Sequence, residues 1–239
     1  MIAGLIKSLG PSLDVAMLYR NMGVTFRSLA SNAFSELQES GNEKGFFFNI
    51  NYMPNPRHRF EIFVDQYQQD WPTFSTPGKK MGNIYSFQYT YRPNKKTEMY
   101  GRIQSDNNNL KLRIHASFMP LPTLTCRLRN EMINIRSVTG ETDSGQLAYL
   151  ELVYKPSLKP FSASVRCSFY DTEGYATRIY AYERDIPAYY AVPPHYGEGT
   201  RGYLVVQYKL GKSLHCAGKW SMDPRKSEWR AQLIWQWGP

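Results

Sequence analysis

The amino-acid sequence predicts an all-β chain of about 12 antiparallel strands that follow one another in up-and-down order. Two patterns support this prediction. Apolar and polar residues alternate over long stretches, which is the period of a β-strand and not of a helix. Stretches of this kind also end repeatedly in an aromatic residue that precedes a short turn containing Pro or Gly. The aromatic residues at these turns are Tyr52, Tyr91, Phe118, Tyr154 and Tyr208.

The alternation is clearest at residues 109–118. Leu110, Leu112 and Ile114 share one face there, while Lys111 and Arg113 share the other. In chain order, the expected strands are 12–21, 45–53, 58–68, 83–92, 96–105, 109–118, 123–136, 145–155, 160–171, 200–210, 213–222 and 227–237. Strands of roughly 9–11 residues are long enough to cross a lipid bilayer when they are tilted.

Short and long connections alternate along this series of strands. The connections expected on the long side are 22–44, 69–82, 106–108, 137–144, 172–199 and 223–226. An even number of strands would place both chain ends beside the short turns, as in bacterial outer-membrane barrels. We therefore expect residues 1–239 to form a single up-and-down transmembrane β-barrel domain, with short periplasmic turns and longer external loops.

The choice between a membrane barrel and a water-soluble one depends on the apolar face. Aromatic residues make up 15% of the chain, and the mean hydropathy is -0.51. A soluble barrel of this size would present mainly Lys and Glu to water, whereas here aromatic residues gather at strand ends. That placement predicts a lipid-facing band in the bacterial outer membrane, with lipid or lipopolysaccharide as its partner. The expected aromatic girdle is Tyr52, Tyr91, Phe118, Tyr154, Tyr208, Trp235 and Trp237.

The polar face carries more cations than acids. The whole chain has 29 Lys and Arg against 20 Asp and Glu, a net charge of +9, which favours anionic partners. The basic residues expected to line the lumen are Arg102, Lys111, Arg113, Arg127, Arg129, Arg166, Arg201 and Arg230. Two interpretations stay open: a pore that favours anions, or an internal ion-pair network that plugs the barrel because buried charges must be paired.

Residues 172–199 form a connection far longer than two neighbouring strands need. Its many tyrosines are unlike a disordered segment, so we expect an ordered external loop or plug. The residues of interest are Arg178, Tyr180, Tyr182, Arg184, Tyr189, Tyr190, His195 and Tyr196. Either these tyrosines and arginines bind a sugar or nucleotide by stacking and charge, or the tyrosines pack on one another and seal the barrel.

Two long runs of sequence resemble a known family. The run FSASVRCSFYDTEGYATRIYAYERDIPAYYAVPPHYGEGTRGYLVVQYK is similar to the C-terminal barrel region of bacterial helix-hairpin-helix proteins, in which a competence-type DNA-binding domain precedes an outer-membrane-like barrel. LGPSLDVAMLYRNMGVTFRSLASNAFSE and NEKGFFFNINYMPNPRHRFEIFVDQY resemble the start of that barrel. The resemblance implies an outer-membrane location and a link to DNA handling.

A helix-hairpin-helix motif is not found in this sequence, so its DNA-binding residues have no counterpart here. The chain is expected to be the barrel alone, truncated at its N-terminus, with a signal peptide and a DNA-binding domain missing. Nucleic acid is then an implied partner only through a domain absent from this chain, and other envelope proteins are further implied partners.

The expected function is that of a non-enzymatic membrane anchor or conduit in a system such as DNA uptake. One alternative is a soluble antiparallel β-domain that binds carbohydrate or protein through the Tyr-rich loop. The other is an outer-membrane lipid-modifying enzyme, which would need a nucleophile with a histidine beside it. No G-x-S-x-G or H-x-x-x-H context surrounds any of the histidines, which are His58, His115, His195 and His215. We therefore expect no catalytic residue, metal site or cofactor.

Overall fold

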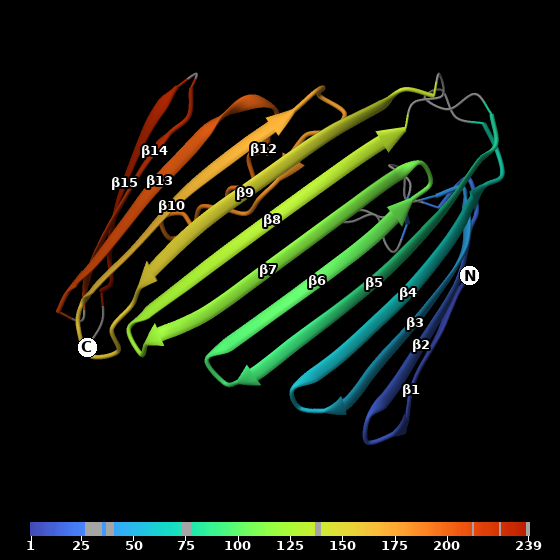
Figure 1. Cartoon of the computed structure of the whole chain (residues 1–239), viewed down its shortest axis with the longest axis horizontal. Coiled ribbons are helices and arrows are strands. Elements are labelled where there is room, and N and C mark those ends of the chain that lie inside the picture. The colour runs from blue at the N-terminus through green and yellow to red at the C-terminus, as the bar shows by residue number, and fades with distance from the viewer. Residues whose placement is uncertain are drawn as a thin grey trace. The chain divides into compact units, whose positions relative to one another are not determined.

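The computed structural model describes residues 1–26, 35–36, 41–72, 78–136, 140–211, 213–224 and 226–237. These residues hold one sheet of 13 strands and a second sheet of two short strands (Figure 1). The large sheet contains β1 (Ile2–Gly10), β2 (Leu13–Met22), β3 (Glu43–Asn55), β4 (His58–Gln69), β5 (Lys80–Asn94), β6 (Thr97–Asp106), β7 (Asn109–Leu121), β8 (Leu124–Arg136), β9 (Thr142–Tyr154), β10 (Phe161–Thr172), β13 (Gly197–Leu210), β14 (Leu214–Met222) and β15 (Ser227–Trp235). The small sheet contains β11 (Ile179–Tyr180) and β12 (Pro194–His195). No helix in this described part of the chain is long and apolar enough to cross a membrane.

The strands of the large sheet lie in the order in which they occur along the chain. The one step that skips numbers is from β10 to β13, because the small sheet lies between them in sequence. Neighbouring strands pair antiparallel, for example Cys167 of β10 with Leu150 of β9 and with Gly202 of β13. The predicted all-β, antiparallel, up-and-down fold is therefore confirmed.

The first strand was not expected from the sequence. Residues 2–10 form β1, which pairs with β2 from Ile2 opposite Arg20 to Gly10 opposite Leu13. The large sheet is therefore odd-numbered, and Ile2 lies beside the end of β2 from which the long connection leaves. The prediction that the N-terminal end lies beside the short turns is thus wrong. The alternation fails in β1 because Leu5 and Ile6 are adjacent and point to opposite faces, both of them exposed.

The chain divides into two compact units, Met1–Tyr91 with Gly101–Leu110 and Arg92–Tyr100 with Lys111–Pro239. The first unit buries a charged group on one face of its sheet. Arg20 donates from Nε to Glu43 Oε1 at 2.5 Å and from its terminal nitrogens to Asp65 at 2.8 and 3.1 Å. Gly45 lies opposite Arg20, where a Cβ atom would be 2.6 Å from the guanidinium carbon. Glycine at this position therefore leaves room for the buried arginine.

The second unit has two chemically different faces. On β9 the buried side chains include Tyr149, Glu151 and Val153, whereas Leu150 between them is 45% exposed. We call the face of this unit that carries Glu151 its inner face, and the face that carries Leu150 its outer face. The long connection between β10 and β13, residues 173–196, packs on the inner face, since β11 contacts β9. We call this connection the inner loop.

Candidate functional site

The inner loop is an extended segment with strand-like alternation. Ile179, Ala181 and Glu183 are 3%, 1% and 1% exposed, whereas Tyr180 and Tyr182 between them are 46% and 47% exposed. Odd-numbered residues thus face the sheet and even-numbered tyrosines face away from it. The letters IYAYERD carry this period-two signal in the sequence, although we expected only an ordered external loop or plug and no alternation within it.

The first part of the inner loop is held by apolar packing. Ile179 and Ala181 form a buried cluster with Ile133 of β8 and with Leu147 and Tyr149 of β9. Close backbone approach accompanies this packing, because a Cβ atom on Gly145 would lie 2.6 Å from the carbonyl oxygen of residue 177. Burying these side chains removes apolar area from water, which stabilises the docked loop.

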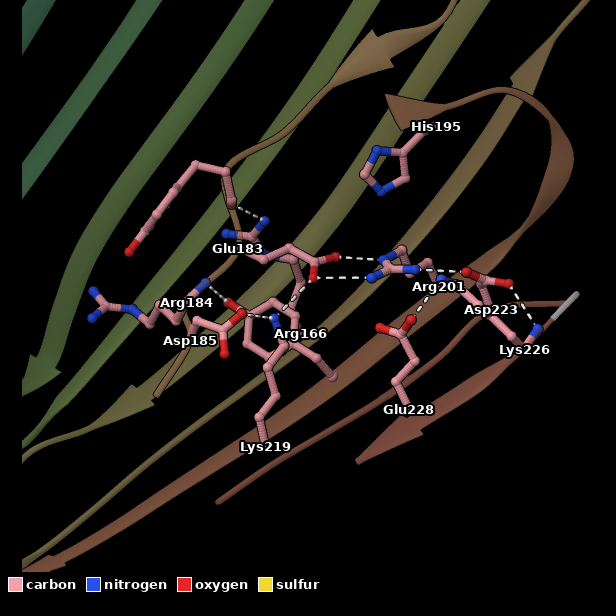
Figure 2. Close-up of polar contacts among 12 residues, drawn as sticks. Arg166, Glu183, Arg184, Asp185, His195, Arg201, Lys219, Asp223, Lys226 and Glu228 are labelled. Carbon is pink, nitrogen blue, oxygen red and sulfur yellow. Dashed lines mark hydrogen bonds and ion pairs between the residues drawn. The ribbon is translucent and has the colours of Figure 1, made fainter. Parts of the chain in front are cut away.

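The next part of the inner loop is held by ion pairs. Arg201 Nε donates to Glu183 Oε1 at 2.6 Å, and Lys219 Nζ contacts Glu183 Oε2 at 3.2 Å and Asp185 Oδ2 at 3.0 Å. Arg230 contacts the same Asp185 oxygen at 2.7 Å. The cations come from β13, β14 and β15 respectively, and Figure 2 shows Arg201 and Lys219 beside the two acids of the loop. We call Glu183 and Asp185 the loop acids, and Arg201, Lys219 and Arg230 the wall cations.

A second buried cluster centres on Glu151 of β9. Its carboxylate binds Arg166 of β10 at 2.9 Å and Arg127 of β8 at 2.7 Å, and it accepts a hydrogen bond from the Tyr203 hydroxyl. Arg166 also donates to the carbonyl oxygen of Tyr182 at 2.6 Å. This arginine therefore ties a strand of the sheet to the backbone of the inner loop.

The other predicted lining residues fall into smaller groups. Arg113 and Arg129 share the carboxylate of Glu131, with Arg113 at 2.8 Å. Lys111 is half-buried on β7, the strand that also carries Arg113. In the first unit, Arg102 donates to the Gln88 side-chain oxygen at 2.8 Å.

The loop tyrosines predicted as ligand-binding residues mostly point away from the sheet. Tyr182 packs on Tyr190 with ring centroids 5.3 Å apart, and Tyr175 packs on Tyr196 at 5.4 Å. Tyr180 and Tyr189 are also exposed, and the half-buried Arg178 lies over the Tyr175 ring, with its guanidinium carbon 4.1 Å from the ring centroid. Arg184, half-buried, donates from its backbone to the Tyr203 hydroxyl at 3.3 Å.

Sequence reasoning did not identify the acids that hold the site together, and it left Lys219 out of the expected basic lining. Lys219 is buried on β14, and its partners Glu183 and Asp185 lie more than 30 residues earlier in the chain. A count of cations on the polar faces of the strands cannot show which acids neutralise them. The alternation of residues 179–185 was the one signal that could have placed the loop acids on the sheet.

His195 anchors the other end of the inner loop. Its buried ring lies edge-on to the Tyr170 ring, with the two ring centroids 5.2 Å apart. Its Nδ1 lies 3.2 Å from the carbonyl oxygen of Ile179. Among the described residues, its buried Nε2 has no hydrogen-bond partner. Burial lowers the pKa of His195 below its ordinary value; the Glu183 carboxylate opposes this shift, while Arg201 and Arg166 add to it.

Acidification is expected to weaken the docking of the inner loop. The neutral ring fits the docked loop, so docking is fully stable above the ordinary histidine pKa of about 6.5 and weakens as the pH falls below it. Trypsin cleavage after Arg184 measures undocking. The control variant is His195→Asn, whose amide keeps a hydrogen-bond donor for the Ile179 carbonyl but does not titrate. The ratio of the wild-type cleavage rate to that of the variant should rise by roughly threefold from about pH 7.5 to about pH 5.5. The ratio cancels the pH dependence of trypsin, and a constant ratio would contradict this role for His195.

The residues expected to form an aromatic girdle lie near strand ends beside the short turns, except Trp237, which follows the end of β15. Tyr52, Tyr208, Trp235 and Trp237 are exposed, and the two tryptophan rings are 5.8 Å apart. Tyr91, Phe118 and Tyr154 are half-buried.

No protein-family model and no curated protein sequence matches the chain. Two solved structures are similar to it. One is the NanC porin, with a TM-score of 0.40 and 9% identity, and the match covers 82% of this chain and 94% of that chain. The other is the KdgM porin in complex with disordered oligogalacturonate, with a TM-score of 0.34, 12% identity and the same coverage of 82% and 94%. These likenesses are too distant to assign a function, which has to be argued from the residues of this chain.

Proposed function

We propose that this chain is a non-enzymatic β-barrel of the bacterial outer membrane, serving as a membrane anchor or as a conduit that its inner loop narrows. The observation that carries this proposal is the inverted polarity of the second unit. Charged side chains are buried on its inner face, whereas apolar side chains are exposed on its outer face. A protein surrounded by water buries its apolar side chains instead.

The exposed apolar residues are neighbours across several strands. Leu128 of β8 pairs with Leu150 of β9, which pairs with Cys167 of β10, and Val165 of β10 pairs with Leu204 of β13. All of these side chains except Cys167 are large and apolar, and all are exposed. A continuous apolar surface of this kind marks contact with lipid or with another protein. Lipid fits better, because period-two alternation with a charged inner face is the pattern of a membrane barrel.

Two features favour an anchor over an open pore. The inner loop covers part of the inner face of the second unit, and the wall cations that would attract anions are already paired with acids. A link to DNA uptake is supported only by the resemblance to helix-hairpin-helix proteins. We therefore propose nucleic acid, lipopolysaccharide and other envelope proteins as binding partners of the complete system.

The alternative functions are less well supported. A soluble binding domain does not account for the exposed apolar outer face. A lipid-modifying enzyme would need an accessible histidine beside a nucleophile, whereas His195 is a buried residue of the inner loop and its Nδ1 lies 3.2 Å from a backbone carbonyl oxygen.

Extraction and gel mobility test the proposal. The protein expressed in a Gram-negative host should stay with the outer-membrane fraction until detergent is added. It should also migrate differently on gels before and after heating, because membrane barrels owe their kinetic stability to a fully paired sheet. Release as a water-soluble monomer without detergent would contradict the proposal. Planar-bilayer recordings then separate the two roles: an anchor gives no conductance and a conduit gives steps.

A further inference from the structure

The inner face carries two like charges directly opposite each other. Lys219 of β14 and Arg230 of β15 are cross-strand partners, and both side chains point to the inner face. Like charges in this position destabilise a pair of strands unless an anion lies between them. Asp185 supplies that anion, because its Oδ2 lies 3.0 Å from Lys219 and 2.7 Å from Arg230. The sheet therefore creates an anion site that the inner loop fills.

The balance of charges around this site gives the charge that a bound anion must carry. The sheet and the turn after β14 contribute the cations Arg201, Lys219, Lys226 and Arg230, while the acids paired with them from the same elements are Asp223 and Glu228. Four cations and two acids leave a surplus of two positive charges, which the loop acids cancel. Without the loop, the wall would require an anion with two charges.

An opening beside the site gives an external anion a way in. A cavity of about 470 Å³ lies between the inner loop and the sheet. Val192, Pro193 and Tyr196 line it from the loop side, and all three wall cations line it from the other side together with Lys226. A molecule in this cavity would reach the wall cations without first crossing the apolar part of the loop.

We propose that Arg201, Lys219 and Arg230 form a binding site for small multivalent anions, which the loop acids occupy as an internal ligand. An external anion that binds there displaces the inner loop from the sheet. The anion must carry at least two charges, because the loop acids are tethered and compete at a high effective concentration. Chloride and other single charges cannot replace both carboxylates at once. This inference concerns the loop and the sheet, and it stands whether the protein acts as an anchor or as a conduit.

Inorganic pyrophosphate is the probe for the test, with the full chain purified in detergent micelles. In the double variant Glu183→Gln/Asp185→Asn the loop no longer competes, so calorimetry should show pyrophosphate binding roughly tenfold or more tighter than in the wild type. Adding Lys219→Met to the double variant should remove this gain, because one of the three wall cations is then missing. The matched control is Glu173→Gln/Glu198→Gln, which removes the same charge at the start of the inner loop and at the beginning of β13, and it should bind like the wild type.

If the control variant gained as much affinity for pyrophosphate as the double variant, the proposal would be overturned, because net charge alone would then explain the binding. A gain that survives Lys219→Met would also overturn it. The wild type gives a second measurement that needs no folded variant. Pyrophosphate should speed trypsin cleavage after Arg184 several-fold, whereas potassium chloride at equal ionic strength should not. Equal effects of the two salts would mean that screening, and not a site, releases the loop.

Discussion

Replacing Leu150 by Arg is expected to lower the free energy of unfolding by about 2–4 kcal/mol when the protein is folded in lipid vesicles. Leu150 lies near the middle of β9 on the outer face, beside Leu128 and Cys167. A charge at this depth must be moved from water into hydrocarbon, which is the origin of the cost. If the outer face were in water instead, the same change at an exposed position would alter stability by no more than about 0.5 kcal/mol. Denaturant titration in vesicles measures the difference.

Leu158→Arg is the matched control for this prediction. Leu158 is 99% exposed in the short turn between β9 and β10, so the substitution is identical but the new charge stays in water. Its effect should stay within about 0.5 kcal/mol. Equal effects at the two leucines would place the outer face in water and contradict the membrane proposal.

Glu151→Gln is expected to cost about 3–5 kcal/mol of stability, since it leaves a buried arginine without its carboxylate. Arg166 is only 4% exposed and binds Glu151 at 2.9 Å. The amide keeps the shape of the side chain, so the loss comes from charge and not from a cavity. Arg166 keeps its position over the Tyr149 ring at 4.0 Å, which offsets a small part of the cost. The measurement is again the midpoint and slope of denaturant unfolding.

The control for Glu151 is an ion pair of the same chemistry at the surface of the same unit. Glu98 binds Arg92 at 2.6 Å, with side chains 40% and 46% exposed. Glu98→Gln should cost about 0–1 kcal/mol, because water screens the pair and solvates the arginine that remains. A similar loss for both variants would show that Glu151 is not held in a dry interior.

The strands could be predicted because their sequences alternate, and the long-range ion pairs could not. Leu110, Leu112 and Ile114 share a face of β7 as expected, and the short turns fall where Pro and Gly interrupt the alternation. β1 was missed because Leu5 and Ile6 are both apolar, so neither face is marked as the buried one. Strand boundaries were close: about half of the predicted strands are longer in the structure, and the others have the predicted length or are slightly shorter.

The site was predicted in part, through its cations. Arg166, Arg201 and Arg230 were placed on the polar face correctly by alternation alone. Their acids could not be assigned, because the loop that supplies Glu183 and Asp185 meets the sheet through tertiary packing. No local spacing specifies that contact.

The alternating contacts of residues 179–185 limit how this connection can change in evolution. Surface connections usually tolerate insertions and deletions well. Here the gain or loss of one residue between Ala181 and Glu183 would turn the acids away from Arg201 and Lys219 and bring Arg184 against the sheet, as a register slip does in a strand. Relatives that keep this arrangement should therefore vary in the side chains of this segment while its length stays fixed.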